Sequence, residues 1–242
     1  MRIRLTVSYR GSRYAGWQVQ RDAPTIQGEL QAVVSRLMGR EVAVTGASRT
    51  DAGVHAVGQV CHFDAPRELP LPRWMRAFAR LLPEDIRVLD CRPADADFHA
   101  RFSALGKTYL YHVDPAPIAS PFLSPFSWHR PRITDFEEMA RAAAFLQGPV
   151  HQRAFASRPE GDRDRRGIES FTVDAGARLV TFTVVGRSFL RHAVRGMVGT
   201  LLEVGYGRRS ADSVRSMATA AADHPLMVKA PAHGLCLLRV DY

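Results

Sequence analysis

The hydrophobic pattern of this chain changes its period in the same order twice, and that repetition restricts the folds it can adopt. Alternating apolar and polar residues are typical of strands, whereas apolar residues three and four positions apart are typical of amphipathic helices. In the first half these patterns predict, in chain order, a strand at 2–9, a helix at 26–38, strands at 41–47 and 60–63, a helix at 72–82 and a strand at 86–88. The order is βαββαβ, the ferredoxin-like or split-βαβ arrangement.

The second half repeats this order with insertions. Strands are predicted at 99–113, 168–174, 178–185 and 235–241, and helices at 135–146, 188–204 and 211–222. We therefore expect an α+β protein made of two ferredoxin-like halves, residues 1–98 and 99–242, joined around a central cleft.

The charge of the chain favours a polyanionic partner. It carries 33 basic and 24 acidic residues, a net charge of +9, and all the basic residues except Lys107 and Lys229 are arginines. A GC-rich genome would explain the preference for arginine over lysine, but not the excess of basic over acidic residues. Because a basic protein without a membrane helix most often meets nucleic acid, we expect a nucleic-acid ligand.

The sequence also bears on the compartment. No apolar run reaches the roughly 18–20 residues that cross a bilayer. The N-terminal residues enter an alternating pattern at once, without the apolar region of a signal peptide. We expect a cytoplasmic protein with no membrane partner.

The most unusual segment is the polar, glycine-flanked loop at 48–58, between two predicted strands. It lacks the phosphate-binding glycine motifs, which also require a helix to follow. A metal site at His55 and His62 is conceivable, but without a dense ligand cluster both histidines are more often structural. What remains is the carboxylate of Asp51 beside Arg49. The residues alone leave open whether Asp51 is functional or caps its own turn.

The same loop carries a family resemblance. Residues 46–60 read GASRTDAGVHAVGQV and resemble the active-site motif GAGRTDAGVHAxGQV of tRNA pseudouridine synthases of the TruA type. The resemblance covers nearly the whole chain in order. It implies two ferredoxin-like halves around a central basic cleft. Further matching motifs lie at 16–20, 25–30, 82–86, 98–104 with Tyr109 and Tyr111, 189–201 and 230–237.

The resemblance assigns roles to four residues. It implies that Asp51 is the catalytic residue, as nucleophile or base, and that Arg49 assists extrusion of the target base. Tyr109 resembles the tyrosine that stacks on the uracil, although a strand tyrosine taken alone is more often part of a core. Arg195 resembles the arginine that pairs with the catalytic aspartate. No cofactor and no metal are implied.

The resemblance also implies a substrate and an assembly. Uridines at positions 38 to 40 in the anticodon arm of tRNA would be converted to pseudouridine by a homodimer. The RNA-facing surface is expected in residues 151–195, which hold nine arginines and five acidic residues. Within that range, Arg187, Arg191 and Arg195 recur every four residues and predict a positive stripe on the helix at 188–204.

Four positions depart from the family pattern. Arg10 stands where the family usually has Asp, Ala79 where it commonly has Asn, and Gln152 and Arg166 lie in altered motifs between the helix at 135–146 and the strand at 168–174. Two alternatives therefore stay open: a related synthase with altered RNA or site specificity, and a non-catalytic RNA-binding protein on the same scaffold. The intact loop around Asp51 argues against the second.

Overall fold

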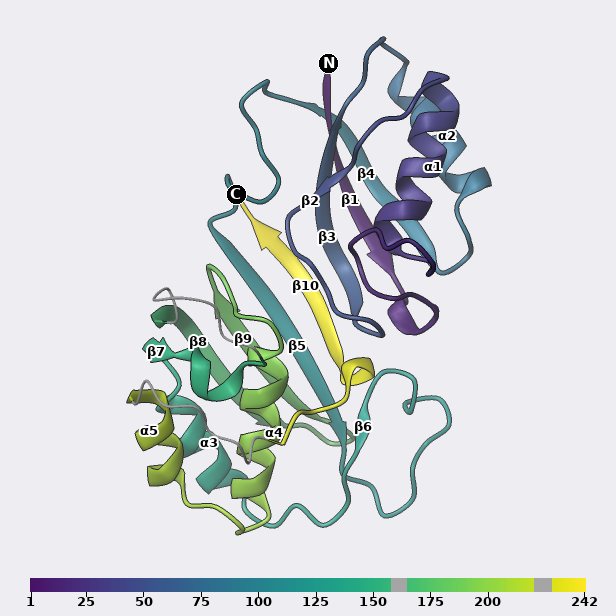
Figure 1. Cartoon of the computed structure of the whole chain (residues 1–242). Helices are drawn as coiled ribbons and strands as arrows, with labels where there is room; N and C mark the ends of the chain where they lie inside the picture. Colours follow the sequence, from purple (N-terminus) through teal and green to yellow (C-terminus); the bar gives the residue numbers. More distant parts are fainter. Residues whose placement is uncertain (158–164, 220–227) are drawn as a thin grey trace. The chain divides into compact units, whose positions relative to one another are not determined.

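The computed structural model describes residues 1–157, 165–219 and 228–242 (Figure 1). The chain divides into two compact units. The first unit consists of Met1–Leu105 and Cys236–Tyr242, and the second of Gly106–Leu235. Within the described ranges, no helix has both the length and the apolar character needed to cross a membrane.

The first unit has the expected βαββαβ order. Its sheet has the strand order β4-β1-β3, and the short strand β2 pairs antiparallel with one end of β3. This is the strand order of a split-βαβ fold. The elements are β1 (Arg2–Tyr9), α1 (Ile26–Met38), β2 (Thr45–Gly46), β3 (His55–Asp64), α2 (Leu71–Leu81) and β4 (Ile86–Ala94).

Helix α1 begins and ends where local side-chain chemistry predicts. The Thr25 hydroxyl accepts a hydrogen bond from the Gly28 N–H (3.2 Å), which satisfies one of the free donors of the first turn. Gly39 ends the helix with a φ of 71°, a left-handed conformation that glycine adopts without steric cost. Ile26, Leu30 and other residues of one face are buried, so the helix packs by a single apolar stripe.

Two segments of the first unit differ from the expected strands. Of residues 41–47, only Thr45–Gly46 pair in the sheet, because the Val42 and Val44 N–H groups donate to side chains of α1 instead (3.0 and 3.1 Å). Residues 99–105 form turns rather than strand. The backbone of this segment forms hydrogen bonds outside the sheet ladder. For example, the Ala100 N–H donates to Nδ1 of His62 (3.2 Å).

The second unit is also a mixed α+β structure. Strands β5, β9, β8 and β7 form an antiparallel sheet in that order, and β6 pairs parallel with β5. Helix α4 is buried around almost its whole circumference, which makes it the central helix of the unit. The elements are β5 (Gly106–Asp114), β6 (Trp128–His129), α3 (Phe136–Ala144), β7 (Gly148–His151), β8 (Arg165–Ala175), β9 (Val180–Gly186), α4 (Ala193–Gly205) and α5 (Ala211–Thr219).

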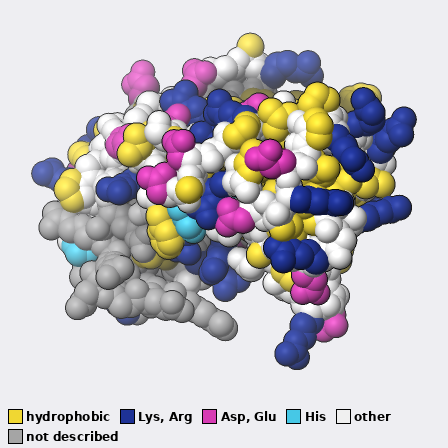
Figure 2. Space-filling model, turned by 90° about the horizontal axis from the view of Figure 1, so that it is seen from above, with side chains coloured by type: hydrophobic (Ala, Val, Ile, Leu, Met, Phe, Trp, Pro, Cys, Tyr) yellow, Lys and Arg dark blue, Asp and Glu magenta, His cyan; other side chains and the backbone are white. Residues whose placement is uncertain are grey.

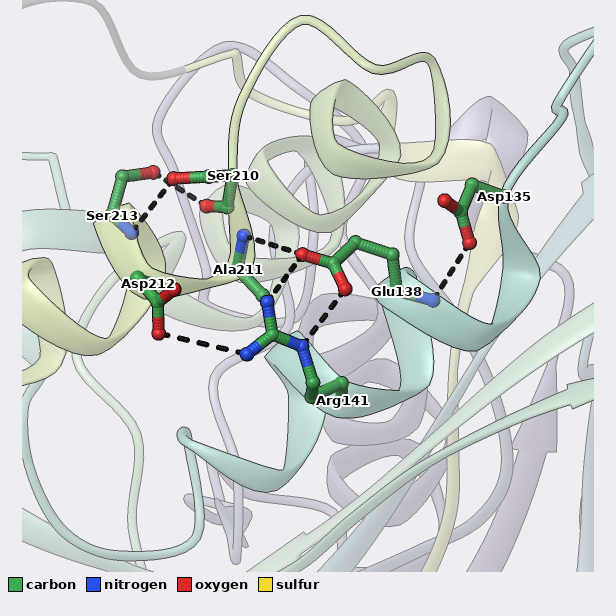
Figure 3. A network of polar contacts seen from close by, with 7 residues as sticks. All are labelled: Asp135, Glu138, Arg141, Ser210, Ala211, Asp212 and Ser213. Atoms are coloured by element: carbon green, nitrogen blue, oxygen red, sulfur yellow. Dashed lines mark hydrogen bonds and ion pairs between the residues drawn. The ribbon is translucent and has the colours of Figure 1, made fainter.

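A polar network joins α3 to the start of α5 (Figure 3). Asp135 caps α3 by accepting from the Glu138 N–H (2.8 Å). The Glu138 carboxylate accepts from the Arg141 guanidinium (2.6 Å) and from the Ala211 N–H (3.2 Å). The hydrogen bond from Arg141 lowers the pKa of the Glu138 carboxyl. Arg141 also lies 3.6 Å from the Asp212 carboxylate, so one side chain ties both helices together.

The last strand, β10 (Leu235–Asp241), belongs to the first unit except for its first residue. It pairs parallel with β3 at Cys236 and Leu237. The Leu105 N–H donates to the Asp241 carbonyl (2.9 Å) and the Tyr242 hydroxyl to the Ala100 carbonyl (2.6 Å). The units therefore differ from the halves 1–98 and 99–242 expected from the sequence. The strand that completes the second βαββαβ order along the chain lies in the first unit.

Candidate active site

The loop between β2 and β3 is held against the segment that follows β1 (Figure 1). The Trp17 N–H donates to the Thr50 carbonyl (3.0 Å), and the hydroxyls of Tyr9 and Thr50 share a hydrogen bond of 2.8 Å. Gly16 has a φ of 98°, and a Cβ there would lie 2.6 Å from the Thr50 carbonyl oxygen. Glycine is therefore required at this position both by conformation and by space.

A buried glutamine fixes the start of the same loop. Gln59 on β3 has no exposed surface, and its side-chain amide bonds both backbone groups of Ser48. The Gln59 Oε1 accepts from the Ser48 N–H (3.2 Å), and the Gln59 Nε2 donates to the Ser48 carbonyl (2.7 Å). Such double pairing satisfies buried groups that would otherwise cost free energy, so it holds the loop in one conformation.

Asp51 lies at the turn of this fixed loop. Its carbonyl accepts from the Val54 N–H (3.1 Å), and Gly53 adopts a φ of 82°. The Asp51 side chain is half-buried, while Arg49 is exposed. The loop thus presents a carboxylate and a guanidinium two residues apart on a rigid support, as a preorganised site requires.

The two histidines near the loop have structural partners. His55 Nδ1 accepts from the Gly11 N–H (3.1 Å), and His62 Nδ1 accepts from the Ala100 N–H (3.2 Å). Both side chains are buried. Burial and the charges of Arg2 and His99 lower the pKa of His62 to about 4, which keeps the imidazole neutral. The structural interpretation of both residues fits these contacts.

Tyr109 lies on β5 of the second unit and is 7% exposed. Its ring contacts that of Phe189 edge-to-face, with centroids 5.5 Å apart. The segment carrying Phe189 is held by Gln152, which is fully buried. The Gln152 Oε1 accepts from the Leu190 N–H (2.8 Å), and its Nε2 donates to the Ser188 carbonyl (3.3 Å).

Arg195 lies in the first turn of α4 and is 9% exposed. Its Nε donates to the Ala230 carbonyl (2.7 Å), and the Ala230 N–H donates to the Arg195 carbonyl (3.1 Å). These two hydrogen bonds hold Arg195 against the segment before β10.

The prediction that Arg187, Arg191 and Arg195 form a positive stripe on one helix was wrong. Helix α4 begins at Ala193 rather than 188, because Gln152 holds residues 188–190 and His192 has a left-handed φ of 67°. Arg187 and Arg191 precede the helix and are exposed, whereas Arg195 is buried. Part of the expected RNA-facing range, residues 158–164, lies outside the described residues. On the face in Figure 2, Lys and Arg side chains are spread among acidic and apolar ones.

The predicted site residues fall into two pairs. Arg49 and Asp51 share one loop of the first unit, and Tyr109 and Arg195 belong to the second unit. Sequence reasoning did not identify the residues that hold them, namely Tyr9, Gln59 and Gln152. Gln59 stands within the motif at 46–60 and Gln152 within an altered motif, but neither pattern indicates that these side chains bond the backbone of another segment.

Comparison with known proteins identifies the family. A family model described as tRNA pseudouridine synthase matches residues 5–103 and 142–242, which include Asp51 and Arg195. The tRNA pseudouridine synthase A of Moorella thermoacetica is 40% identical over 243 residues, 99% of each chain. Those of Syntrophotalea carbinolica and Geobacillus sp. are 39% identical, over 99% of this chain and 96% of that relative, and 41% identical, over 100% and 98%. The chain therefore belongs to the tRNA pseudouridine synthase family.

Proposed function

We propose that this chain converts uridine to pseudouridine in tRNA and that Asp51 is its catalytic residue. The observation that carries the proposal is the rigid loop that presents the Asp51 carboxylate. Tyr9, Trp17 and Gln59 hold the loop through hydrogen bonds to Thr50 and Ser48, just before that residue. Membership of the family and the names of the relatives support the same activity.

The chemistry needs one well-placed carboxylate. The bond from uracil N1 to C1′ breaks, the base turns, and a bond from C5 to C1′ forms. The proton lost from C5 is balanced by the proton gained at N1, so the product is an isomer and no electrons are transferred. Asp51 acts either as the nucleophile at the sugar or as the base that removes a ribose proton.

The target base must also leave its stack, which costs a few kcal/mol. We assign the exposed Arg49 to this extrusion and the ring of Tyr109 to stacking on the extruded uracil. We further assign to Arg195 the role of the arginine that the family resemblance pairs with the catalytic aspartate. The hydrogen bonds of Arg195 to Ala230 and the contact of Tyr109 with Phe189 support these roles, because both side chains are held in place.

We further propose that the target lies in the anticodon arm and that the protein acts as a cytoplasmic homodimer, in which one tRNA contacts both subunits. Light scattering of the protein alone and with tRNA tests the assembly. A single protein chain in both samples, after the mass of the RNA is subtracted, would contradict the homodimer.

Tritium release tests the activity. A tRNA transcript labelled with [5-³H]uridine is incubated with the purified chain, and released tritium is counted. Isomerisation frees the C5 hydrogen, so release is expected, and pseudouridine mapping of the product should place the modification in the anticodon arm. Binding of the transcript without tritium release would indicate a non-catalytic RNA-binding protein. Release with modification elsewhere would mean altered site specificity.

A further inference from the structure

Arginines and aromatic rings gather where residues 128–132 meet the end of α4 in the second unit. The Arg130 guanidinium lies 3.9 Å from the centre of the Trp128 ring, and that of Arg208 lies 4.9 Å from the Tyr206 ring. The Tyr206 hydroxyl donates to the Pro131 carbonyl (3.0 Å) and so joins the two segments. Stacking on an aromatic face restricts a guanidinium while leaving its N–H edge available.

The charge of this cluster is unbalanced. Among the described residues, Arg208 forms an ion pair with Glu203 (3.3 Å), and no ion pair joins Arg130 or Arg132 to a carboxylate. Arg132 and Arg208 are exposed. The Arg130 Nε is buried and has no hydrogen-bond partner among the described residues. The Trp128 ring, rather than an acceptor atom, is the contact that the structure shows for this guanidinium.

Arg132 has a conformation that an arginine seldom adopts. Its φ is 67°, in the left-handed region that favours glycine. A strained residue persists where the surrounding structure determines it, and such residues concentrate at functional sites. Glycine would adopt this φ without steric strain. The presence of an arginine therefore indicates that its side chain has a function.

Arg195 and Tyr111 bond adjacent residues of the segment before β10. Arg195 donates to the Ala230 carbonyl, and the Tyr111 hydroxyl donates to the carbonyl of the next residue, Pro231 (2.9 Å). Burial raises the pKa of Tyr111, and the charges of Arg195 and Arg130 oppose that rise, so both lie near its hydroxyl. The backbone at Ala230 and Pro231 therefore links Arg195 to Tyr111.

We propose that Arg130, Arg132 and Arg208, the arginine track, bind the phosphate backbone of the RNA substrate beyond the target uridine. The proposal rests on the proposed function. Phosphate is the partner that fits, because the guanidinium fork pairs with phosphate oxygens and the track carries more positive than negative charge. The stacked rings set the orientation of the guanidiniums before the RNA arrives.

Variants of the two exposed arginines test the track. Arg132→Gly removes a charge and relieves the left-handed strain, and Arg208→Gln removes a second charge. Arg36→Ala, on the exposed side of α1 in the first unit, is the control for the loss of one charge. The measurements are the dissociation constant of unlabelled tRNA transcript at several salt concentrations and the melting temperature.

We expect each track variant to weaken tRNA binding several-fold and the double variant about tenfold or more. The slope of log K against log salt should fall by about one for each arginine removed. The melting temperature of Arg132→Gly should equal or exceed that of the wild type. If the dissociation constant of the double variant for tRNA lies within twofold of that of Arg36→Ala, the arginine track does not bind the RNA. This conclusion holds even if the wild type releases tritium. If the wild type releases no tritium but the binding pattern holds, the track stands and the proposed activity fails.

Discussion

Two roles are proposed for Tyr109, as a stacking surface for the uracil or as a core side chain, and substitution can separate them. Truncation to alanine would leave a cavity beside Phe189 and would damage fold and site together, because the side chain is almost fully buried. Tyr109→Leu keeps most of the apolar volume but removes the aromatic surface, whereas Tyr109→Phe keeps the ring.

If the ring stacks on the uracil, Tyr109→Leu should lower the single-turnover rate roughly 5- to 150-fold, as a loss of 1–3 kcal/mol of stacking implies. Tyr109→Phe should stay within a few-fold of the wild type. Rates from tritium release and melting temperatures are measured for both variants. Equal rates for the two would mean that Tyr109 serves the core alone.

At the residue scale, the sequence located the loop but not what holds it. The motif around Asp51 was recognisable because its glycines and polar residues stand out between apolar strands. The hydrogen bonds from Tyr9 and Gln59 join residues 41 and 11 positions apart, and no local pattern encodes such pairs. Local patterns also do not predict the surroundings of Tyr109 and Arg195, because tertiary packing determines them.

At the scale of elements, periodicity was overridden wherever a distant side chain supplied the backbone hydrogen bonds. Residues 41–44 alternate as a strand does, yet Ser35 and Gln31 on α1 accept from their N–H groups. Residues 188–190 fit a helical pattern, yet Gln152 bonds their backbone. Helix α1 was predicted within its observed bounds because its cap, apolar stripe and final glycine are all local.

Gln152 gives the test at this scale. Gln152→Leu leaves the Leu190 N–H and the Ser188 carbonyl without their partner, which costs about 1–3 kcal/mol per unsatisfied group. We expect a lower melting temperature and, because Phe189 would shift against Tyr109, a lower single-turnover rate. Gln147→Leu is the matched control, since Gln147 is exposed and donates a single bond to the Phe171 carbonyl (3.3 Å). Equal effects of the two substitutions would contradict a special role for Gln152.

At the scale of the whole molecule, acid should destabilise the fold through His62. Its pKa is about 4 in the folded protein against an ordinary value of 6.5, because burial disfavours the charged ring. The unfolded chain therefore takes up a proton below pH 6.5 that the folded protein takes up only near pH 4. Linkage requires the free energy of unfolding to fall as the pH drops through this window.

His62→Gln retains an acceptor for the Ala100 N–H but does not titrate, so the fall in stability between pH 6.5 and 4 should be smaller in this variant. Urea unfolding midpoints across this pH range give the comparison. His233→Gln, which removes a half-exposed histidine, serves as the control and should follow the wild type. A His62→Gln profile parallel to the wild type would show that other groups govern the acid response.

We propose that Asp51 performs the isomerisation while other residues provide RNA affinity, and Asp51→Asn tests this division of roles most directly. The substitution keeps the shape of the side chain but removes its charge and its ability to act as nucleophile or base. Single-turnover tritium release should fall at least about a hundredfold, since one lost catalytic group commonly costs that much or more. The dissociation constant for tRNA should stay within a few-fold of the wild type. A variant that binds tRNA normally and keeps more than a few per cent of the wild-type rate would contradict the account.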